Sequence, residues 1–376
     1  MTSTRAPRPG TARRFARGLA AGAAAAALLV TGCAAGEPSP SDSDAAATLD
    51  RIIISTPTPP GTPAGAPVWI GEKIGFFAEE GLDVQIVTFP GRPSDAVATV
   101  VAGQSDLVIS VPDALIVPTA NGDDLGLTWA FTPYQRPSFV VAVAADSDIE
   151  TAADLEGATV AMPSQGAPFE TFLNANIEDE GGDPSTVTAV TLAPNAALES
   201  MRNGIVDAVV LNRGELALAA QVTGYQAKEL PLAPAVEQGI AAGFMMRTDV
   251  SDERRDVYAR YLRAYLKSAI FAQENPEAAV RLSWELYPES KSTEGSEEDA
   301  LAAAVAMMRA TVDEFVPAAD GTWGLITQER WESYVANLGL SDKLPDVSVL
   351  FDNSLLERIS DFDEDAVREE ARSFAG

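Results

Sequence analysis

Histidine is absent from the 376 residues of the chain, and cysteine occurs once, at Cys33. Without histidine there is no Ser-His-Asp or Cys-His catalysis and no metal site that needs an imidazole ligand. If Cys33 is consumed by a modification, no thiol remains for a disulfide or a cysteine metal site. Carboxylates could still serve a hydrolase or bind Ca²⁺, but the chain has no D-x-[DN]-x-[DN]-G loop. We therefore expect no catalytic residue, no metal and no cofactor.

Basic residues are scarce as well. The chain has 26 Lys and Arg against 55 Asp and Glu, a net charge of -29. Phosphate backbones repel such a surface, so we expect no nucleic-acid partner. After the N-terminal segment no apolar run approaches the length of a membrane-spanning helix, which is about 20 residues. Beyond residue 32 the chain is too long for one ordinary core and about right for two domains.

The N-terminal segment is basic and then apolar. Its five arginines, with no acidic residue among them, are followed by the run Gly18–Val30, which is too short to span a bilayer. Thr31 and Gly32 then stand immediately before Cys33, an arrangement that resembles the bacterial lipobox. We predict a signal peptide over residues 1–32, a lipid on Cys33, and location on the extracytoplasmic face of the cell membrane. The alternative is a cysteine that lies near a signal peptide by chance, and the export route, Sec or Tat, stays open.

Residues 33–48 form the next segment, which is small, polar and proline-containing, and we predict a flexible tether there. Strand and helix patterns then alternate. Strands are expected at 51–55, 83–89, 106–110, 125–130, 138–144, 158–162, 187–192, 207–211 and 240–247. Helices are expected at 68–80, 94–102, 112–120, 151–155, 168–180, 195–203, 214–222, 252–273, 276–286, 298–315, 327–338 and 355–374. This alternation predicts an α/β fold of two lobes, with mainly parallel sheets, helices on both faces and a helical C-terminal region.

An ordered set of short motifs accompanies these elements. In the first lobe they are Gly75-Phe76-Phe77, Gly81-Leu82-Asp83-Val84, Gly91 and Gly103-Gln104-Ser105-Asp106. In the second they are Leu155-Glu156-Gly157, Gly166 and Asn203-Gly204 with Asp207, and Asn275-Pro276-Glu277 follows later. Together, over roughly residues 50 to 290, the chain resembles the periplasmic solute-binding proteins for nitrate, taurine, alkanesulfonates and thiamine-pyrimidine precursors.

The resemblance implies a periplasmic-binding-protein-like fold of type II. It implies lobe I over 49–138 and 243–376, lobe II over 139–242, and hinges near 136–143 and 239–244. It also implies a monomer that captures a small-molecule nutrient between its lobes and delivers it to an ABC permease and its ATPase. Two alternatives are a ligand-sensing lipoprotein and an enzyme of thiamine-pyrimidine synthesis. Enzymes of that kind use an active-site histidine and an iron site, so the missing histidine argues against the second alternative.

Ligands of such sheets bind at the carboxyl ends of the strands, which selects the loops to search. Ser164, Gln165 and Gly166 precede a helix, where their amides either hold an anionic or carbonyl group or only cap the helix. Ser110 holds the equivalent position in the other lobe. Asp113 either caps the next helix or accepts a hydrogen bond from an amino group of the ligand.

Aromatic and basic residues complete the candidate site. Trp69 and Tyr134 either stack on a planar ligand or pack in the core. Asn212 and Arg213 end a strand, and Arg213 either pairs with an anionic ligand or bridges the lobes or faces water. Arg92 stands where sulfonate-binding relatives carry the second of two glycines, and it either contacts an anionic ligand or points to solvent. We expect a thiamine-pyrimidine-like heteroaromatic ligand or an organosulfonate or nitrate.

Overall fold

The structure is a computed structural model that describes residues 49–376 except 90–92, 167, 238, 294 and 375–376. The described residues belong to one compact unit. The predicted signal peptide, Cys33, the tether and Arg92 lie outside the described residues. Within the described part no helix is both long and apolar enough to cross a membrane.

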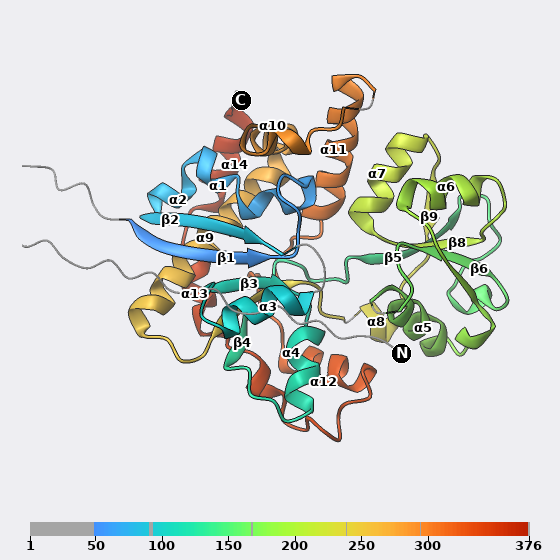
Figure 1. The fold of residues 1–376 in the computed structure, drawn as a ribbon, viewed down its shortest axis with the longest axis horizontal. Coiled ribbons are helices and arrows are strands. Elements are labelled where there is room, and N and C mark those ends of the chain that lie inside the picture. Colours follow the sequence, from blue (N-terminus) through green and yellow to red (C-terminus); the bar gives the residue numbers. More distant parts are fainter. Residues whose placement is uncertain (1–48, 90–92, 167, 238, 294, 375–376) are drawn as a thin grey trace, which may run out of the picture. The chain divides into compact units, whose positions relative to one another are not determined.

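Two five-stranded sheets organise the fold (Figure 1). The first has the order β2 (Leu82–Thr88), β1 (Asp50–Thr56), β3 (Leu107–Ser110), β10 (Gly243–Arg247) and β4 (Leu127–Phe131). The second has the order β7 (Thr188–Thr191), β6 (Thr159–Met162), β8 (Ala208–Asn212), β5 (Phe139–Ala144) and β9 (Ala227–Glu229).

Both sheets are mixed, and the expectation of mainly parallel sheets is confirmed, because a single strand in each sheet runs against the other four. Four strands of each sheet run in the same direction, namely β2, β1, β3 and β4 in the first and β7, β6, β8 and β9 in the second. β10 is antiparallel to β3 and β4, and β5 is antiparallel to β8 and β9. The reason is connectivity: β5 and β10 are each reached from the other sheet, so neither belongs to a βαβ crossover, which is what forces parallel pairing.

Both faces of each sheet are buried. This explains why the strand sequences are continuous apolar runs and do not alternate between apolar and polar residues. In β5, Val140 and Ala142 join one buried cluster, whereas Val141 and Val143 join another on the opposite face. Figure 1 shows the helices that form these two layers: α6 (Pro194–Arg202) and α7 (Arg213–Thr223) on one side, α5 (Phe169–Asp179) and α8 (Pro234–Glu237) on the other. The first sheet is covered in the same way by α3 (Pro93–Val101) and α9 (Asp252–Glu274).

The remaining helical elements are as follows: η1 (Pro63–Val68), α1 (Gly71–Ile74), α2 (Phe76–Glu79), α4 (Asp113–Ala120), η2 (Ala153–Leu155), η3 (Pro184–Thr186), α10 (Pro276–Leu286), η4 (Pro288–Ser290), α11 (Glu297–Val312), α12 (Gln328–Asn337), η5 (Val347–Leu350), η6 (Asn353–Leu355), α13 (Leu356–Ile359) and α14 (Glu364–Ser373). The structure agrees with most of the expected elements within a few residues. β9 and α8 are additional elements that the sequence patterns did not indicate.

Two expected helices are broken. In place of the helix expected over 68–80 the chain forms two short helices, α1 and α2, and it takes a left-handed conformation at Gly75 (φ 108°) between them. Glycine alone adopts this conformation without cost, so the helix ends there. The helix expected over 355–374 divides into α13 and α14, because the Asp363 side chain caps a new helix by accepting a hydrogen bond from the amide of Ala366.

α11 connects the two halves of the fold. It packs against α7, which flanks the second sheet, and also against η1, α9 and α10, which belong with the first. Gly214 lets α7 approach this closely, since a Cβ there would lie 2.8 Å from Oγ1 of Thr311 on α11. The chain itself passes between the sheets twice, at residues 132–138 and 230–242.

Candidate ligand-binding site

A cavity of about 320 Å³, lined by both polar and apolar residues, lies at the carboxyl ends of β1, β3 and β8. Further walls come from both connections between the sheets, from η1 and α5, and from the end of α11. Four of the ten predicted ligand residues line it: Ser110, Tyr134, Asn212 and Arg213. The rule that ligands bind beyond the carboxyl ends of the strands thus led to four residues that the fold brings to one cavity, and their contact with a ligand stays a prediction.

Ser110 is the last residue of β3 and is buried. Its Oγ makes no hydrogen bond to any other described residue. A buried hydroxyl without a partner costs about 1–3 kcal/mol, so such a group is rare unless something absent from the structure binds it. A serine hydroxyl can both donate and accept. Ser110 is therefore suited to contact a ligand in the cavity.

Arg213 does not present a free positive charge to the cavity. Its Nη1 forms an ion pair with Oε1 of Glu314 at 3.0 Å, and its Nε donates to Glu229 at 3.1 and 3.2 Å. Glu314 also pairs with Nε of Arg136 at 3.2 Å. Arg213, on α7, is thus linked to β9 and to the segment after α11. Of the alternatives predicted for Arg213, this is a bridge between the lobes and not exposure to water. An anionic ligand would have to compete with two carboxylates for this guanidinium.

Tyr134 packs its ring edge-on against Phe315, with the centroids 4.6 Å apart. Burial raises the pKa of the Tyr134 hydroxyl, and the nearby charge of Glu314 raises it further. The hydroxyl therefore stays protonated at neutral pH and is available as a hydrogen-bond donor. The prediction for Tyr134 is either stacking on a ligand or packing in the core. Its ring packs on Phe315, and Tyr134 also lines the cavity.

Asn212 caps α7. Its side-chain oxygen accepts from the amide of Gly214 at 3.0 Å, and Glu215 accepts from the amide of Asn212 at 3.2 Å. This reciprocal capping box orients the start of α7 and so places Arg213 beside the cavity. Burial raises the pKa of the Glu215 carboxyl above its ordinary value. Asn212 thus has a structural role at the cavity wall.

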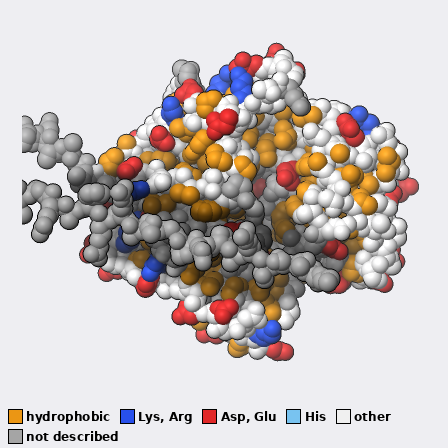
Figure 2. Space-filling view, viewed as in Figure 1, with side chains coloured by type: hydrophobic (Ala, Val, Ile, Leu, Met, Phe, Trp, Pro, Cys, Tyr) orange, Lys and Arg blue, Asp and Glu red, His pale blue; other side chains and the backbone are white. Residues whose placement is uncertain are grey.

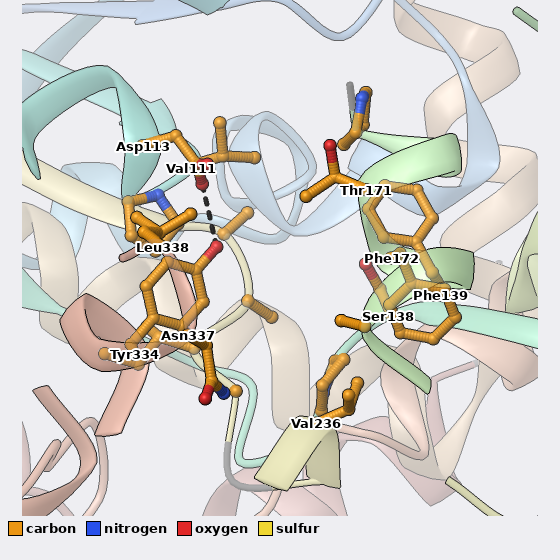
Figure 3. A pocket seen from close by; sticks show the side chains of 18 residues that line it. Val111, Asp113, Ser138, Phe139, Thr171, Phe172, Val236, Tyr334, Asn337 and Leu338 are labelled. Carbon is orange, nitrogen blue, oxygen red and sulfur yellow. Dashed lines mark hydrogen bonds between the residues drawn. The ribbon is translucent and has the colours of Figure 1, made fainter. Parts of the chain in front are cut away.

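Asp113 lines a second cavity, of about 160 Å³, that adjoins the first. Its carboxylate does not cap α4, which corrects the capping alternative. Instead it accepts a hydrogen bond from the hydroxyl of Tyr334 on α12 at 2.7 Å (Figure 3). Val111, Ser138, Phe139 and Ala242 line both cavities.

The other five predicted residues either lie away from these two cavities or fall outside the described residues. Trp69 is 1% exposed, and its Nε1 donates to Oγ of Ser283 at 2.8 Å, so its place is the core and the predicted stacking is wrong. Ser164 and Gln165 are exposed, Gln165 donates to the carbonyl of Ala189, and the amide of Gly166 donates to Glu170. These three residues line none of the cavities found in the described part of the chain. Arg92 lies outside the described residues.

Sequence reasoning missed Glu314, Tyr334 and Phe139. Phe139 lies in a predicted hinge, so its place near the cleft could have been anticipated. Glu314 and Tyr334 lie in the helical C-terminal region, more than a hundred residues from Arg213 and Asp113, and no local pattern marks them. Among the residues that the structure describes, no group of three or more Cys, Asp and Glu side chains is arranged to hold a metal ion.

Comparisons with known proteins now bear on this site. The profile of the family described as "NMT1/THI5 like" matches residues 62–279, more than half of the chain. The chain belongs to this family. A formylaminopyrimidine-binding protein from Halalkalibacterium halodurans is 29% identical over 224 residues. That match covers 57% of this chain and 64% of the relative, so the chain spans less than two thirds of the length of this relative.

Solved structures are similar to the NMT1/THI5-like chain at lower identity. The periplasmic aliphatic sulphonate binding protein from Escherichia coli is 15% identical with a TM-score of 0.55, and the match covers 82% of this chain and 91% of that protein. The periplasmic nitrate-binding protein from Synechocystis PCC 6803 is 14% identical with a TM-score of 0.50, covering 86% and 88%. These likenesses confirm the predicted two-lobed fold of the periplasmic binding proteins.

Proposed function

We propose that this NMT1/THI5-like chain is an extracytoplasmic solute-binding protein that delivers a small nutrient to an ABC permease and its ATPase. Residues 1–32 are its signal peptide, Cys33 carries a lipid, and 33–48 tether the fold to the membrane. Lobe I comprises 49–138 and 243–376, and lobe II comprises 139–242. The protein acts as a monomer and catalyses no reaction.

The observation that carries this proposal is the cavity at the carboxyl ends of the strands, with the unpartnered hydroxyl of Ser110 in its wall. Strands and helices of both sheets contribute to the cavity, so a ligand there touches both lobes. A ligand that binds more tightly when the two lobes are closed around it stabilises the closed conformation. The permease then recognises the closed conformation.

The ligand that fits this cavity is a neutral, hydrogen-bonding heteroaromatic rather than nitrate or a sulfonate. Three charged residues, Arg213, Glu215 and Glu314, line the cavity, and two of them are acidic. Since Arg213 is already held by Glu229 and Glu314, no cation among the described lining residues is available to balance an anion. Ser110 and the neutral Tyr134 offer donors and an acceptor to ring nitrogens and amino groups. The likeness to a formylaminopyrimidine-binding protein supports the same class.

Thermal unfolding against a ligand panel tests the proposal. We expect 4-amino-2-methylpyrimidine to raise the melting temperature, whereas nitrate, taurine and alkanesulfonates leave it unchanged. A ligand at 100 times its Kd adds about 2.7 kcal/mol of stability. Ser110→Ala and Tyr134→Phe should each weaken pyrimidine binding by about 5- to 30-fold, the equivalent of one or two lost hydrogen bonds.

Ser341→Ala serves as the matched control because Ser341 is exposed and lines none of the described cavities. Its pyrimidine affinity should equal that of the unaltered protein. Stabilisation by nitrate or a sulfonate, undiminished in Ser110→Ala, would contradict the assignment of a neutral ligand.

The lipid anchor is tested separately in cells. A clickable palmitate analogue should label the protein, and Cys33→Ala should abolish the labelling and release the protein from the membrane fraction. Labelling that persists in Cys33→Ala would overturn the proposed anchor.

A further inference from the structure

The second cavity has no role in the function proposed above. Figure 3 shows two walls that face each other across an open space. One wall presents Tyr334 and Leu338 of the C-terminal region, and the other presents Phe139, Phe172 and Val236 beside the second sheet.

The walls of this cavity are mainly apolar. The polar residues in its lining are Asp113, Ser138, Thr171, Tyr334 and Asn337, and the carboxylate of Asp113 accepts a hydrogen bond from the hydroxyl of Tyr334 at 2.7 Å. That pair satisfies the phenol and leaves the ring of Tyr334 as the surface beside Leu338. A polar ligand group placed between Phe172 and Leu338 would lose its contacts with water without replacement, which costs free energy.

The volume of the cavity matches a definite chemical group. At about 160 Å³ it equals the size of an engineered protein cavity, about 150 Å³, that stays dry and binds benzene. The first cavity, at about 320 Å³, is twice as large, and charged residues are among those that line it. Val111, Ser138, Phe139 and Ala242 line both cavities, so the two lie side by side at the connections between the sheets.

We propose that the second cavity is an apolar subsite for an aromatic or branched aliphatic substituent of the same ligand. The substrate is then bipartite, with a hydrogen-bonding ring against Ser110 and Tyr134 and an apolar group between Phe172 and Leu338. The assignment of the polar part rests on the proposed function, whereas the apolar subsite rests on its own walls and volume.

Two pyrimidines that differ only in an apolar group test the subsite. Isothermal titration compares 4-amino-2-methylpyrimidine with its 5-benzyl derivative. We expect the benzyl compound to bind about tenfold tighter or more, because a phenyl ring leaves water. Ala175→Phe fills the subsite from α5, and it should remove this gain while the affinity for the unsubstituted pyrimidine changes by less than about twofold. Ala98→Phe makes the same change on the exposed face of α3 and should keep the gain.

The neutral dye 1-aminoanthracene probes the subsite without a pyrimidine. Its fluorescence should rise with the unaltered protein and with Ala98→Phe, but not with Ala175→Phe. Dye binding that Ala175→Phe blocks, with neither pyrimidine binding, would support the subsite and overturn the polar half of the proposed function. Equal affinity for both pyrimidines, together with dye fluorescence that Ala175→Phe leaves unchanged, would overturn the subsite and leave the proposed function standing.

Discussion

Trp69 and Ser110 are both buried, yet they differ in whether the fold satisfies their polar atoms. The indole of Trp69 donates to Ser283, whereas the hydroxyl of Ser110 has no partner among the described residues. A polar atom that the fold itself satisfies contributes to stability, and one that it leaves unsatisfied is available to a ligand. Because Ser110 also lines the cavity, this distinction marks it, and not Trp69, as a residue of the site.

Trp69→Phe should lower the free energy of unfolding without changing ligand affinity. The substitution keeps an aromatic ring and leaves Oγ of Ser283, which is 1% exposed, without its donor, a loss of about 1–3 kcal/mol. Urea denaturation measures it. The double variant Trp69→Phe/Ser283→Ala should recover part of the loss, because the stranded hydroxyl is then removed. A large fall in ligand affinity with an unchanged free energy of unfolding would contradict this assignment and would show that Trp69 contacts the ligand.

Glu215 couples stability to pH. Burial raises the pKa of its carboxyl above the ordinary value of 4.5. The folded protein therefore holds this proton more tightly than the unfolded chain does, so the contribution to stability is complete below pH 4.5 and declines as pH rises through the folded-state pKa. Glu215→Gln retains an acceptor for the amide of Asn212 and cannot ionise, so the variant should unfold at higher urea than the unaltered protein at pH 7.

That advantage should shrink as the pH falls below about 4.5, where both proteins are neutral at this position. Glu199→Gln, on the exposed face of α6, provides the control and should show no such pattern. A stability difference that is the same at pH 4 and pH 7 would rule out a titrating Glu215 as its cause.

At the scale of elements, α12 holds the two connections between the sheets. Arg330, in the first turn of α12, donates to Oε1 and to the carbonyl of Gln135 at 2.8 and 3.0 Å. It also donates to the carbonyl of Gly239 at 2.6 Å. One planar guanidinium thus joins the outgoing and the returning chain, and burial lowers the pKa of this group.

Arg330→Ala should lower the free energy of unfolding by about 2–3 kcal/mol, because buried carbonyls lose a charged donor. Arg330→Lys should restore little of it, since a single ammonium cannot reach both connections in the geometry of the guanidinium fork. Guanidinium chloride unfolding measures both, with Arg309→Ala at an exposed position of α11 as the control. Full rescue by lysine would show that charge alone, and not the bridge, matters.

At the scale of the whole molecule, the excess of acidic residues opposes compaction. The net charge is -29, and acidic side chains are spread over the face seen in Figure 2. Like charges in a compact state repel one another, and salt screens that repulsion by shortening the Debye length from about 30 Å at 0.01 M to about 8 Å at 0.15 M.

Adding salt should therefore stabilise the protein. We expect the melting temperature to rise by about 2–4 °C between these two NaCl concentrations, the equivalent of about 1 kcal/mol. Differential scanning calorimetry measures the shift, and KCl should produce the same one, because screening depends on ionic strength and not on the cation. A lower melting temperature in salt would mean that the Arg–Asp and Arg–Glu pairs outweigh the repulsion.

The sequence by itself determined most of the strands and helices, the order of the family's motifs, and the positions of Ser110 at the end of β3 and of Arg213 directly after β8. These properties depend on neighbouring residues: periodicity, glycine turns and the position of a residue at the end of a strand. The predicted signal peptide and lipidated Cys33 rest on the sequence alone.

The tertiary structure decided the rest, because it depends on residues that are distant along the chain. A tryptophan in a proline-rich loop has the same local sequence whether its ring lines a cleft or packs on Ser283, which is 214 residues away. Asp113 has the same local sequence whether it caps a helix or accepts from Tyr334, which is 221 residues away. The mixed strand order and the pairing of Arg213 with Glu314 are likewise set by which segments pack together, and packing is a property of the whole chain.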